Sequence, residues 1–362
     1  MSDTKYMQLA LELAGLGAGA VSPNPMVGAV IVRDGQIIGR GYHKEYGSPH
    51  AERNALADCV ANGHSAKGAT LYVTLEPCCH TGKTPPCTSA VIESGISKVV
   101  VGTQDPNLLV AGKGVEILRS CGIEVVVGVL EDECIKQNSV FFHYIKTKTP
   151  YVIMKYAMTA DGKIATHSGK SKWITGELAR NRVHQDRARY AAIMVGVGTV
   201  LADDPLLTCR IEGGRNPVRV VCDTHLRTPN GSQIVKTAKE VKTIIATSCT
   251  NAEKIQAYTD MGCQVLRIPK EGSHINLQAL FQALGEQKID SVLLEGGATL
   301  NWSVLKGDFV QKIQAYIAPK IFGGNAKTPV AGEGVDAPPE AFFFSNTTVT
   351  MLGDDILVES EA

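Results

Sequence analysis

The sequence predicts an α/β protein built from two domains. It contains 362 residues, which is about twice the length of a typical single domain. Short apolar runs alternate with segments of helical periodicity along the chain, as in α/β proteins. The polar stretch 144–150, YIKTKTP, interrupts this alternation. We therefore predict one domain over residues 1–147 and a second domain over residues 150–362.

The first domain should begin with an amphipathic helix, because four apolar residues have helical spacing before a glycine cluster: Met7, Ala10, Leu11 and Ala14. The runs VGAVIV and QIIGRG flank Asp34-Gly35, which predicts a hairpin. A helix over about 51–61 and a strand in ATLYVTL follow. Pro85-Pro86 can open a further helix that Gly95 closes. Strands are then expected in KVVVGT and IEVVVGV.

The second domain shows the same alternation. Buried strands are expected in the apolar runs YVIMKYAM, AAIMVGVG, VRVVC, KTIIATS, CQVLRI, DSVLLEGG and KIQAYIAP. Helical patterns lie around residues 177–189, 276–287 and 298–306. The sequence therefore predicts a second α/β layer structure with its own core.

Composition excludes several classes of protein. Lys plus Arg number 36 and Asp plus Glu also number 36, so no net field attracts nucleic acid. Ten cysteines are too few for a disulfide scaffold in a chain of this length, and we expect Cys59, Cys121 and Cys134 to be core residues. No apolar run is long enough to span a bilayer. We therefore expect a soluble cytoplasmic protein that binds neither membranes nor nucleic acids.

Residues 50–52 (His-Ala-Glu) and 76–87 (EPCCHTGKTPPC) combine potential zinc ligands with a carboxylate. Zinc deaminases pair H-x-E with P-C-x-x-C, although eight residues separate Cys78 from Cys87 here. Catalytic zinc needs three protein ligands. His50 and Cys87 lie at expected helix starts, where a thiolate is favoured. Adjacent side chains diverge, so only Cys78 or Cys79 can join them, and Cys78 matches the signature.

Two other interpretations of these residues compete with catalysis. His50, two cysteines and His80 could form a closed structural zinc site, or the thiols could be reduced and free of metal. Glu52 argues against the closed site, because a purely structural site has no use for this carboxylate, whereas a hydrolytic site needs a proton carrier beside the metal-bound water. We therefore predict a zinc hydrolase in which Glu52 is catalytic and His50, Cys78 and Cys87 hold the metal.

SPNPMVGAVIV, GYHKEYGSPHAERNAL and EPCCHTGKTPPC resemble the deaminase half of the bifunctional riboflavin-biosynthesis deaminase/reductases. In that family the longer cysteine spacing is usual. The resemblance implies a cytidine-deaminase-like αβα sandwich. It also implies zinc-dependent deamination of 2,5-diamino-6-(5-phosphoribosylamino)pyrimidin-4(3H)-one to 5-amino-6-(5-phosphoribosylamino)uracil. Residues in or beside these motifs would contact the base or phosphate, with ordinary loop roles as the alternative: Asn24, His43, His80, Lys83 and Thr84.

In the second domain, LLEGGATLN is a strand that runs into glycines and then a helix. Amides at such a helix start can receive a phosphate, but glycines also serve simply to turn the chain tightly. No G-x-G-x-x-G motif follows a strand in this half. The pattern alone therefore leaves the two interpretations open.

MKYAMTADGKIA, SKWIT, GVGTVLADDPLLTCR, LLEGGATLNWS and IAPKIFGG resemble the reductase half of the same family. This resemblance implies a dihydrofolate-reductase-like α/β fold and reduction of the ribosyl group to ribityl by NADPH. The implied cofactor residues are Ala157, Trp173, Thr199, Asp203, Gly297, Ala298, Thr299, Leu300, Asn301, Trp302 and Ser303. The implied substrate residues are Ser171, Arg187, Leu207, Arg210 and Glu295. Trp173 could instead be a core aromatic, and Lys155 and Asp161 have no assigned role.

Two rival functions and the assembly state remain to be considered. A nucleic-acid base deaminase shares the H-A-E and P-C motifs but needs basic clusters that follow phosphates. A zinc-stabilised interaction module would not need Glu52. The apolar run FFFSNTTVTML near the C-terminal end is compatible with edge pairing. We therefore expect a homo-oligomer, a dimer or higher, that acts on a small pyrimidine ribosyl phosphate.

Overall fold

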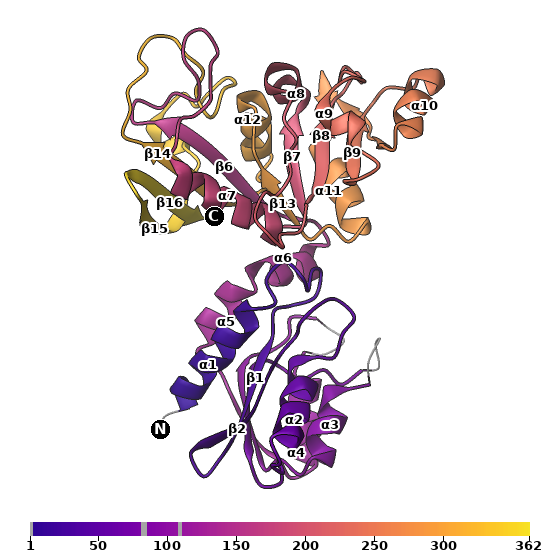
Figure 1. The fold of residues 1–362 in the computed structure, drawn as a ribbon, viewed down its shortest axis with the longest axis vertical. Helices are drawn as coiled ribbons and strands as arrows, with labels where there is room; N and C mark the ends of the chain where they lie inside the picture. Colours follow the sequence, from indigo (N-terminus) through magenta and orange to yellow (C-terminus); the bar gives the residue numbers. More distant parts are fainter. Residues whose placement is uncertain (1–2, 81–84, 108–110) are drawn as a thin grey trace. The chain divides into compact units, whose positions relative to one another are not determined.

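The computed structural model describes residues 3–80, 85–107 and 111–362. The chain divides into two compact units, Met1–Lys148 and Thr149–Ala362, which Figure 1 shows in successive colours. In the described ranges, no helix combines the length and the apolar character that crossing a bilayer requires.

Unit 1 is a five-stranded sheet with helices on both faces (Figure 1). The strand order is β2-β1-β3-β4-β5, with β1 antiparallel to both neighbours and β3, β4 and β5 parallel. Its helices are α1 (Asp3–Gly15), α2 (Ala51–Ala61), α3 (Cys87–Glu93), α4 (Lys113–Ser120), α5 (Glu131–Gln137) and α6 (Ser139–Thr147). Its strands are β1 (Gly28–Arg33), β2 (Gln36–Tyr42), β3 (Thr70–Leu75), β4 (Lys98–Thr103) and β5 (Glu124–Val127).

Alternating strand residues build two separate cores in unit 1. Ala29, Ile31, Leu71, Val73, Val99 and Val101 pack against α2, α3 and α4, whereas Val30, Val32, Tyr72 and Val100 pack against α1 and α5. Helix α2 lies very close to β2, because a Cβ at Gly41 would come within 2.3 Å of the Ala55 nitrogen. Asp34 and Gly35 both have positive φ, as a two-residue hairpin turn requires.

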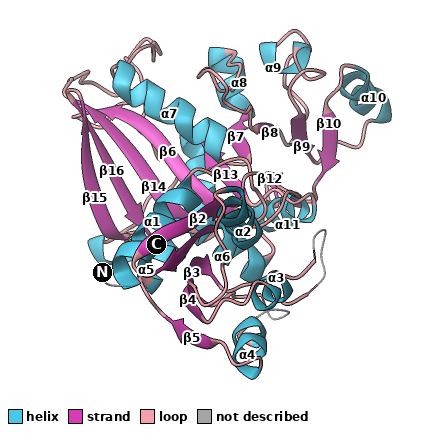
Figure 2. Cartoon of the chain, turned by 60° about the horizontal axis from the view of Figure 1, so that its bottom comes forward, coloured by secondary structure: helices cyan, strands magenta, loops and turns pink. Residues whose placement is uncertain are grey.

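Unit 2 is built on a nine-stranded sheet of order β10-β9-β8-β7-β13-β6-β14-β16-β15. The strands from β10 to β14 in this order are parallel, and β16 and β15 extend the sheet antiparallel (Figure 2). The strands are β6 (Tyr151–Thr159), β7 (Ala192–Gly196), β8 (Val218–Cys222), β9 (Thr243–Thr247), β10 (Gln264–Arg267), β13 (Ser291–Leu294), β14 (Val310–Ala318), β15 (Ser345–Leu352) and β16 (Asp355–Glu361). A separate small hairpin is formed by β11 (Lys270–Glu271) and β12 (His274–Ile275).

Helices cover both faces of this second sheet. They are α7 (Glu177–Arg189), α8 (Val197–Asp203), α9 (Gln233–Lys236), α10 (Ala252–Asp260), α11 (Leu277–Glu286), α12 (Ala298–Lys306) and the 3₁₀ turn η1 (Pro338–Glu340). Helices α11 and α12 pack on one core, and α8, α9 and α10 pack on another. Because the parallel strands end at one edge of the sheet, the segments after β7, β8 and β13 lie at that edge.

The strands and helices expected from the apolar patterns are present, and α7 and α12 have the predicted bounds. Two details of the sequence interpretation were wrong. Helix α3 begins at Cys87, and Pro86 is its N-cap rather than part of its first turn. Cys121 is exposed. It is the C-cap residue after α4, which ends at Ser120, so it does not continue the buried face of that helix. Cys59 and Cys134 are buried as predicted.

Candidate active sites

Three potential metal ligands converge in unit 1. His50 is the N-cap of α2, Cys87 is the first residue of α3, and Cys78 follows β3. The ligand atoms of these residues all lie within 4.8 Å of one another. His50 Nδ1 is 3.6 Å from Cys78 Sγ and 3.4 Å from Cys87 Sγ. Two helix starts and a strand end therefore bring together residues that are far apart in sequence.

The geometry of this group fits zinc. Tetrahedral zinc with bonds of about 2.3 Å to sulfur and about 2.1 Å to nitrogen would hold the two atoms about 3.6 Å apart. The two observed sulfur–nitrogen distances, 3.6 and 3.4 Å, agree with that edge. A hydrogen bond from the Cys87 thiol and the neighbouring His50 lower the pKa of Cys78 to about 4, although burial opposes the shift. Cys78 is thus prepared to be a thiolate, the form that binds metal.

Cys79 and His80, the alternative ligands considered from the sequence, do not join this group within the described residues. Cys79 is half-buried and its pKa is raised, first by burial. His80 is exposed on the loop after β3 and lines the neighbouring cavity. Lys83 and Thr84 lie outside the described residues. A closed four-ligand site that uses His80 is therefore not formed among the described residues, and His50 and Cys78 of the group line the cavity.

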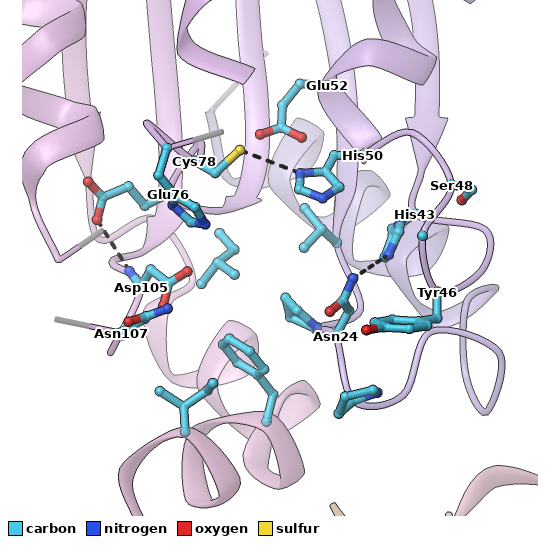
Figure 3. A pocket seen from close by; sticks show the side chains of 18 of the residues that line it. Asn24, His43, Tyr46, Ser48, His50, Glu52, Glu76, Cys78, Asp105 and Asn107 are labelled. Carbon is cyan, nitrogen blue, oxygen red and sulfur yellow. Dashed lines mark hydrogen bonds between the residues drawn. The ribbon is translucent and has the colours of Figure 1, made fainter. Parts of the chain in front are cut away.

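Glu52 lies in the first turn of α2 and is only 3% exposed. Its carboxylate lies beside the contact between Cys78 and His50 (Figure 3). Burial, together with the nearby charge of Cys78, raises the pKa of Glu52 to about 7. A carboxyl group with such a pKa can accept and release a proton near neutral pH.

His50, Glu52 and Cys78 line a cavity of about 320 Å³. The volume is that of a site for a small molecule. Its wall also contains Asn24, His43, Tyr46, Glu76, His80, Asp105, Asn107, Phe141, Tyr144 and Ile145 (Figure 3). Asn24 and His43, two of the sequence candidates, are joined by a contact of 3.2 Å between Asn24 Nδ2 and His43 Nε2. Polar groups therefore surround the metal-binding group on several sides.

Sequence reasoning missed Asp105 and Asn107 as cavity residues. Asp105 is half-buried, and burial followed by the charge of Glu76 raises its pKa to about 6. Glu76 accepts hydrogen bonds from the backbone nitrogens of Asp105, Gly112 and Val115 at 3.3, 2.9 and 3.1 Å. One signal could have found these residues. Asp105 and Asn107 follow β4, which is parallel to β3. They therefore lie at the same edge of the sheet as Cys78, which follows β3.

In unit 2, an ion pair joins two of the predicted substrate residues. Arg187, on α7, donates from Nε and Nη2 to the two carboxylate oxygens of Glu295, which follows β13, at 2.8 Å each. Arg187 Nη1 also donates to the Thr208 carbonyl at 3.0 Å. Lys155 Nζ, on β6, lies 3.8 Å from Glu295 Oε2. Three elements therefore meet around one carboxylate.

The charges of this cluster are strongly coupled. Burial by itself would raise the pKa of Glu295, but the positive charges of Arg187 and Lys155 outweigh it and lower the value to about 2. Burial lowers the pKa of Lys155, although Glu295 opposes that shift. Glu295 is therefore ionised throughout the physiological range, and Lys155 is a more easily deprotonated amine than an exposed lysine.

The expected cofactor segment lies at the start of α12. Gly297 is the N-cap of this helix, and a Cβ added there would lie 3.4 Å from Thr199 Oγ1 of α8. Asn301 is 2% exposed and donates to the Pro329 carbonyl at 2.9 Å, but its buried Oδ1 has no hydrogen-bond partner in the described structure. The free amides of a helix start, approached closely by a hydroxyl, fit a phosphate group of a dinucleotide.

The other candidates of unit 2 occupy different kinds of position. Trp173 is 59% exposed, which excludes the alternative that it is a core aromatic, and the Arg180 guanidinium lies 4.9 Å from its ring centroid. Leu207 is buried with a positive φ of 53°. Asp161 accepts from the Gly323 nitrogen at 2.7 Å and so supports a loop. The remaining candidates are half-buried or exposed on β6, α8, α12 and loops: Ala157, Ser171, Asp203, Arg210, Ala298, Thr299, Leu300, Trp302 and Ser303.

Two family models match the chain, one for each unit. Residues 1–103 match the cytidine and deoxycytidylate deaminase zinc-binding region. Residues 150–358 match the RibD C-terminal domain. These matches explain the two folds: unit 1 is a cytidine-deaminase-like αβα sandwich, and unit 2 is a reductase domain of the dihydrofolate-reductase-like class.

Full-length relatives carry the same combination of domains. The riboflavin biosynthesis protein RibD of Actinobacillus pleuropneumoniae is 53% identical over 99% of this chain and 95% of its own length. The corresponding protein of Escherichia coli is 38% identical over 98% of each chain. A Thermotoga maritima diaminohydroxyphosphoribosylaminopyrimidine deaminase/5-amino-6-(5-phosphoribosylamino)uracil reductase superposes with a TM-score of 0.88 at 42% identity, covering 99% of this chain and 98% of that one.

A structure of Acinetobacter baumannii RibD agrees, with a TM-score of 0.89 at 39% identity over 99% of this chain and 98% of that chain. The similarity thus extends over both units, their cores and the segments that carry the two candidate sites. The chain belongs to the RibD family of bifunctional riboflavin biosynthesis enzymes, in which a zinc-dependent deaminase and an NADPH-dependent reductase share one polypeptide.

Proposed function

We propose that unit 1 deaminates 2,5-diamino-6-(5-phosphoribosylamino)pyrimidin-4(3H)-one and that unit 2 then reduces the ribosyl group of the resulting uracil to ribityl. The substrates follow from those in the name of the Thermotoga maritima relative. The observation that carries the first half is the convergence of His50, Cys78 and Cys87 beside a buried carboxylate. A cavity of about 320 Å³ is large enough for a pyrimidine ring at this group.

In the proposed deamination, His50, Cys78 and Cys87 would hold the metal, and His50 and Cys78 line the cavity that would receive the pyrimidine. Bound zinc would supply the acidification that makes water a nucleophile near neutral pH. Glu52 accepts a proton from the attacking water and passes it to a ring nitrogen of the pyrimidine. The same carboxylate then moves the second water proton to the departing amine. Water oxygen thus replaces nitrogen on the ring, and ammonia leaves.

The raised pKa of Glu52 supports this proton transfer, because an acid–base group works best when its pKa lies near the operating pH. Its burial also keeps bulk water from competing for the proton. Asp105 and Asn107, which also line the cavity, offer polar atoms to the sugar or the base. His50, Glu52, Cys78, Asp105 and Asn107 all line this cavity, and Cys87 lies beside His50 and Cys78.

In the proposed reduction, NADPH supplies a hydride to the sugar carbon attached to nitrogen, in the ring-opened form of the sugar. The start of α12 and Thr199 would receive a phosphate of the cofactor, and Trp173 would cover it from an exposed loop. Glu295, oriented by Arg187, would accept hydrogen bonds from sugar hydroxyls. Lys155 is the buried amine at this cluster that can give the substrate nitrogen its proton.

We further propose that the protein is a cytoplasmic homo-oligomer. Ten free cysteines suit a reducing compartment. The edge strand β15 is exposed along most of its length and carries the exposed apolar residues Val349 and Met351. Unpaired edges with apolar side chains favour association between copies.

One coupled assay tests both halves. The protein is supplied with the pyrimidine phosphate and NADPH, and ammonia and NADPH are followed together with and without a zinc chelator. We expect chelation to stop ammonia release and, because no product is then available for reduction, NADPH oxidation as well. Addition of the deaminated intermediate should restore NADPH oxidation in the chelated protein. Ammonia release from metal-free protein would refute the first half, and no oxidation with the intermediate would refute the second.

A further inference from the structure

The backbone immediately before α7 is irregular, and side chains from other parts of unit 2 satisfy its polar groups. The carbonyl oxygens of Trp173 and Ile174 accept hydrogen bonds from Lys320 Nζ at 3.2 and 2.6 Å. The next carbonyl, that of Thr175, accepts one from Arg180 Nη1 at 2.7 Å. The segment belongs to neither β6 nor α7, so no strand or helix supplies these partners. Two cationic side chains therefore hold three successive carbonyl groups.

The same segment is fixed at its other end, and only its first residue reaches far into solvent. The Gly176 nitrogen donates to Oδ2 of Asp355, the first residue of β16, at 2.6 Å. Ile174 and Thr175 are 7% and 8% exposed, whereas Trp173 is 59% exposed. The backbone is thus anchored in the protein while the Trp173 ring stands outside it. An aromatic ring placed in this way can stack on a planar ligand.

Arg180 also orients the ring itself. Its guanidinium carbon lies 4.9 Å from the Trp173 ring centroid, which is within the range of a cation–π contact. The side chain that holds the Thr175 carbonyl therefore restrains the indole as well. Because the ring is still more than half exposed, surface remains on it for a ligand. Both the backbone and the ring of Trp173 are held without any bound molecule.

Lys320 lies in IAPKIFGG, a segment that carries part of the resemblance to the reductases but has no part in the chemistry proposed above. It follows β14, and its carbonyl accepts a hydrogen bond at 2.9 Å from the nitrogen of Ala160, which directly follows β6. Strands β6 and β14 are neighbours in the sheet. The Lys320 backbone is therefore fixed to the sheet, and its ammonium group ties the Trp173 segment to that fixed point.

We propose that Lys320 is a positioning residue of the NADPH site, which holds the backbone at Trp173 so that the exposed ring is in place before the cofactor binds. The inference rests on the proposed reductase function of unit 2, in which Trp173 contacts NADPH. A segment that is ordered beforehand loses no further freedom on binding, which increases affinity. Lys320 contributes no atom to hydride transfer. Its loss should therefore weaken NADPH binding more than it slows the chemical step.

Single variants separate this role from the loss of a positive charge. Lys320→Met keeps the aliphatic stem and removes the ammonium, whereas Lys320→Arg keeps donors for the same carbonyls. Lys327→Met removes an equal charge from an exposed position on the segment that follows Lys320. With the deaminated intermediate as substrate, Lys320→Met should raise the KM for NADPH about tenfold and change kcat less than about threefold.

The other two variants supply the rescue and the control. Lys320→Arg should keep the KM for NADPH within about threefold of the parent value, and Lys327→Met should match the parent protein. Equal rises in the two methionine variants would reduce the effect to lost charge and overturn the proposal. A parent-like KM in Lys320→Met would overturn it as well.

A double variant decides whether Lys320 acts through Trp173 or touches the cofactor directly with its third N–H group. In a Trp173→Ala background, Lys320→Met should cause no further rise in the KM for NADPH, because the ring that it positions is absent. Additive effects of the two substitutions would indicate direct contact between Lys320 and NADPH, and the positioning role would then be wrong.

Fluorine NMR of protein labelled with 5-fluorotryptophan reports the position of the ring without turnover. The chain has two tryptophans, and Trp173→Phe assigns their signals. In cofactor-free protein, Lys320→Met should move the Trp173 signal toward its position in urea, whereas Lys320→Arg should keep the parent spectrum. The signal of Trp302, whose ring lies against Phe342, should stay unchanged and report intact folding.

An unchanged Trp173 signal in Lys320→Met would overturn the proposal even if the KM for NADPH rises. The NMR experiment needs neither NADPH nor the pyrimidine, so its outcome is independent of the proposed reaction. A parent protein that fails to oxidise NADPH would refute the reductase function, while the expected shift in Lys320→Met would still support the hold of Lys320 on Trp173.

Discussion

The two candidate sites are built on opposite electrostatic principles. In unit 1, one imidazole and two sulfur atoms lie within 4.8 Å of one another, an arrangement that needs a cation to neutralise thiolates. In unit 2, Arg187 and Glu295 neutralise each other through two hydrogen bonds of 2.8 Å. The first site is thus completed by an ion from solution, whereas the second is already charge-balanced within the protein.

The two units therefore depend on their surroundings in different ways. Loss of zinc should remove the chemistry of unit 1, because its ligands have no other function in the cavity. Loss of a charge in unit 2 should instead change the energetics of the fold, because a buried partner is left without its counter-ion. Substitutions in the two units should therefore differ both in what they change and in how much.

The largest effect is expected from removing one zinc ligand beside a matched neighbour. Cys78→Ser should lose bound zinc and lower deamination by roughly a thousandfold or more. Cys79→Ser changes the adjacent residue, which does not belong to the ligand group, and should retain both. Metal content and ammonia release of the two purified variants measure this. Equal zinc content in both variants would contradict the choice of Cys78 as ligand.

A smaller loss is expected when the carboxylate is changed and the metal kept. Glu52→Gln has nearly the same shape but cannot carry a proton, so kcat for deamination should fall by about 10²- to 10⁴-fold. Zinc content should stay at the parent value, because Glu52 is not one of the ligands. Reduction of the deaminated intermediate should proceed normally in unit 2. A variant with full ammonia release and bound zinc would remove Glu52 from the mechanism.

The candidate zinc site could be predicted from the sequence because zinc binding requires histidine and cysteine, which are uncommon residues. Histidine and cysteine at helix starts, with a glutamate two residues from the histidine, form a combination that a catalytic zinc site requires and a packed core does not. The choice of Cys78 over Cys79 followed from the divergence of adjacent side chains and the match to the signature, and Cys78 lies in the group with His50 and Cys87. The fold was equally accessible where periodicity is strong, as in α7 and α12.

Other parts of the sites depend on packing that no local pattern encodes. Phe141, Tyr144 and Ile145 reach the cavity from α6 because that helix lies against the core of unit 1. The pairing of Arg187 with Glu295 joins residues 108 positions apart. Family resemblance indicated each of these two residues, but their mutual contact requires α7 and the end of β13 to meet.

The smallest expected effect concerns acid stability of unit 2. The folded-state pKa of Glu295 is about 2, below its unfolded value of about 4.3. The ionised group therefore stabilises the fold above about pH 4.3, and this contribution is lost as the pH falls toward 2. Between pH 5 and pH 3 the parent protein should lose roughly 1–2 kcal/mol more unfolding free energy than Glu295→Gln. Urea unfolding can be followed by tryptophan fluorescence, because both tryptophans, Trp173 and Trp302, lie in unit 2.

An exposed ion pair in the same unit supplies the matched control. Lys306 and Glu333 are 3.0 Å apart, with 62% and 82% of their side chains exposed. Solvent screens such a pair, so Glu333→Gln should reproduce the parent protein's dependence on pH. Because only the Glu295 variant removes a titrating group from a buried pair, only that variant should have a shallower loss of stability toward acid. The same slope in both variants would mean that Arg187 and Lys155 do not hold the Glu295 pKa down, and the contrast between the two sites would then lose its energetic basis.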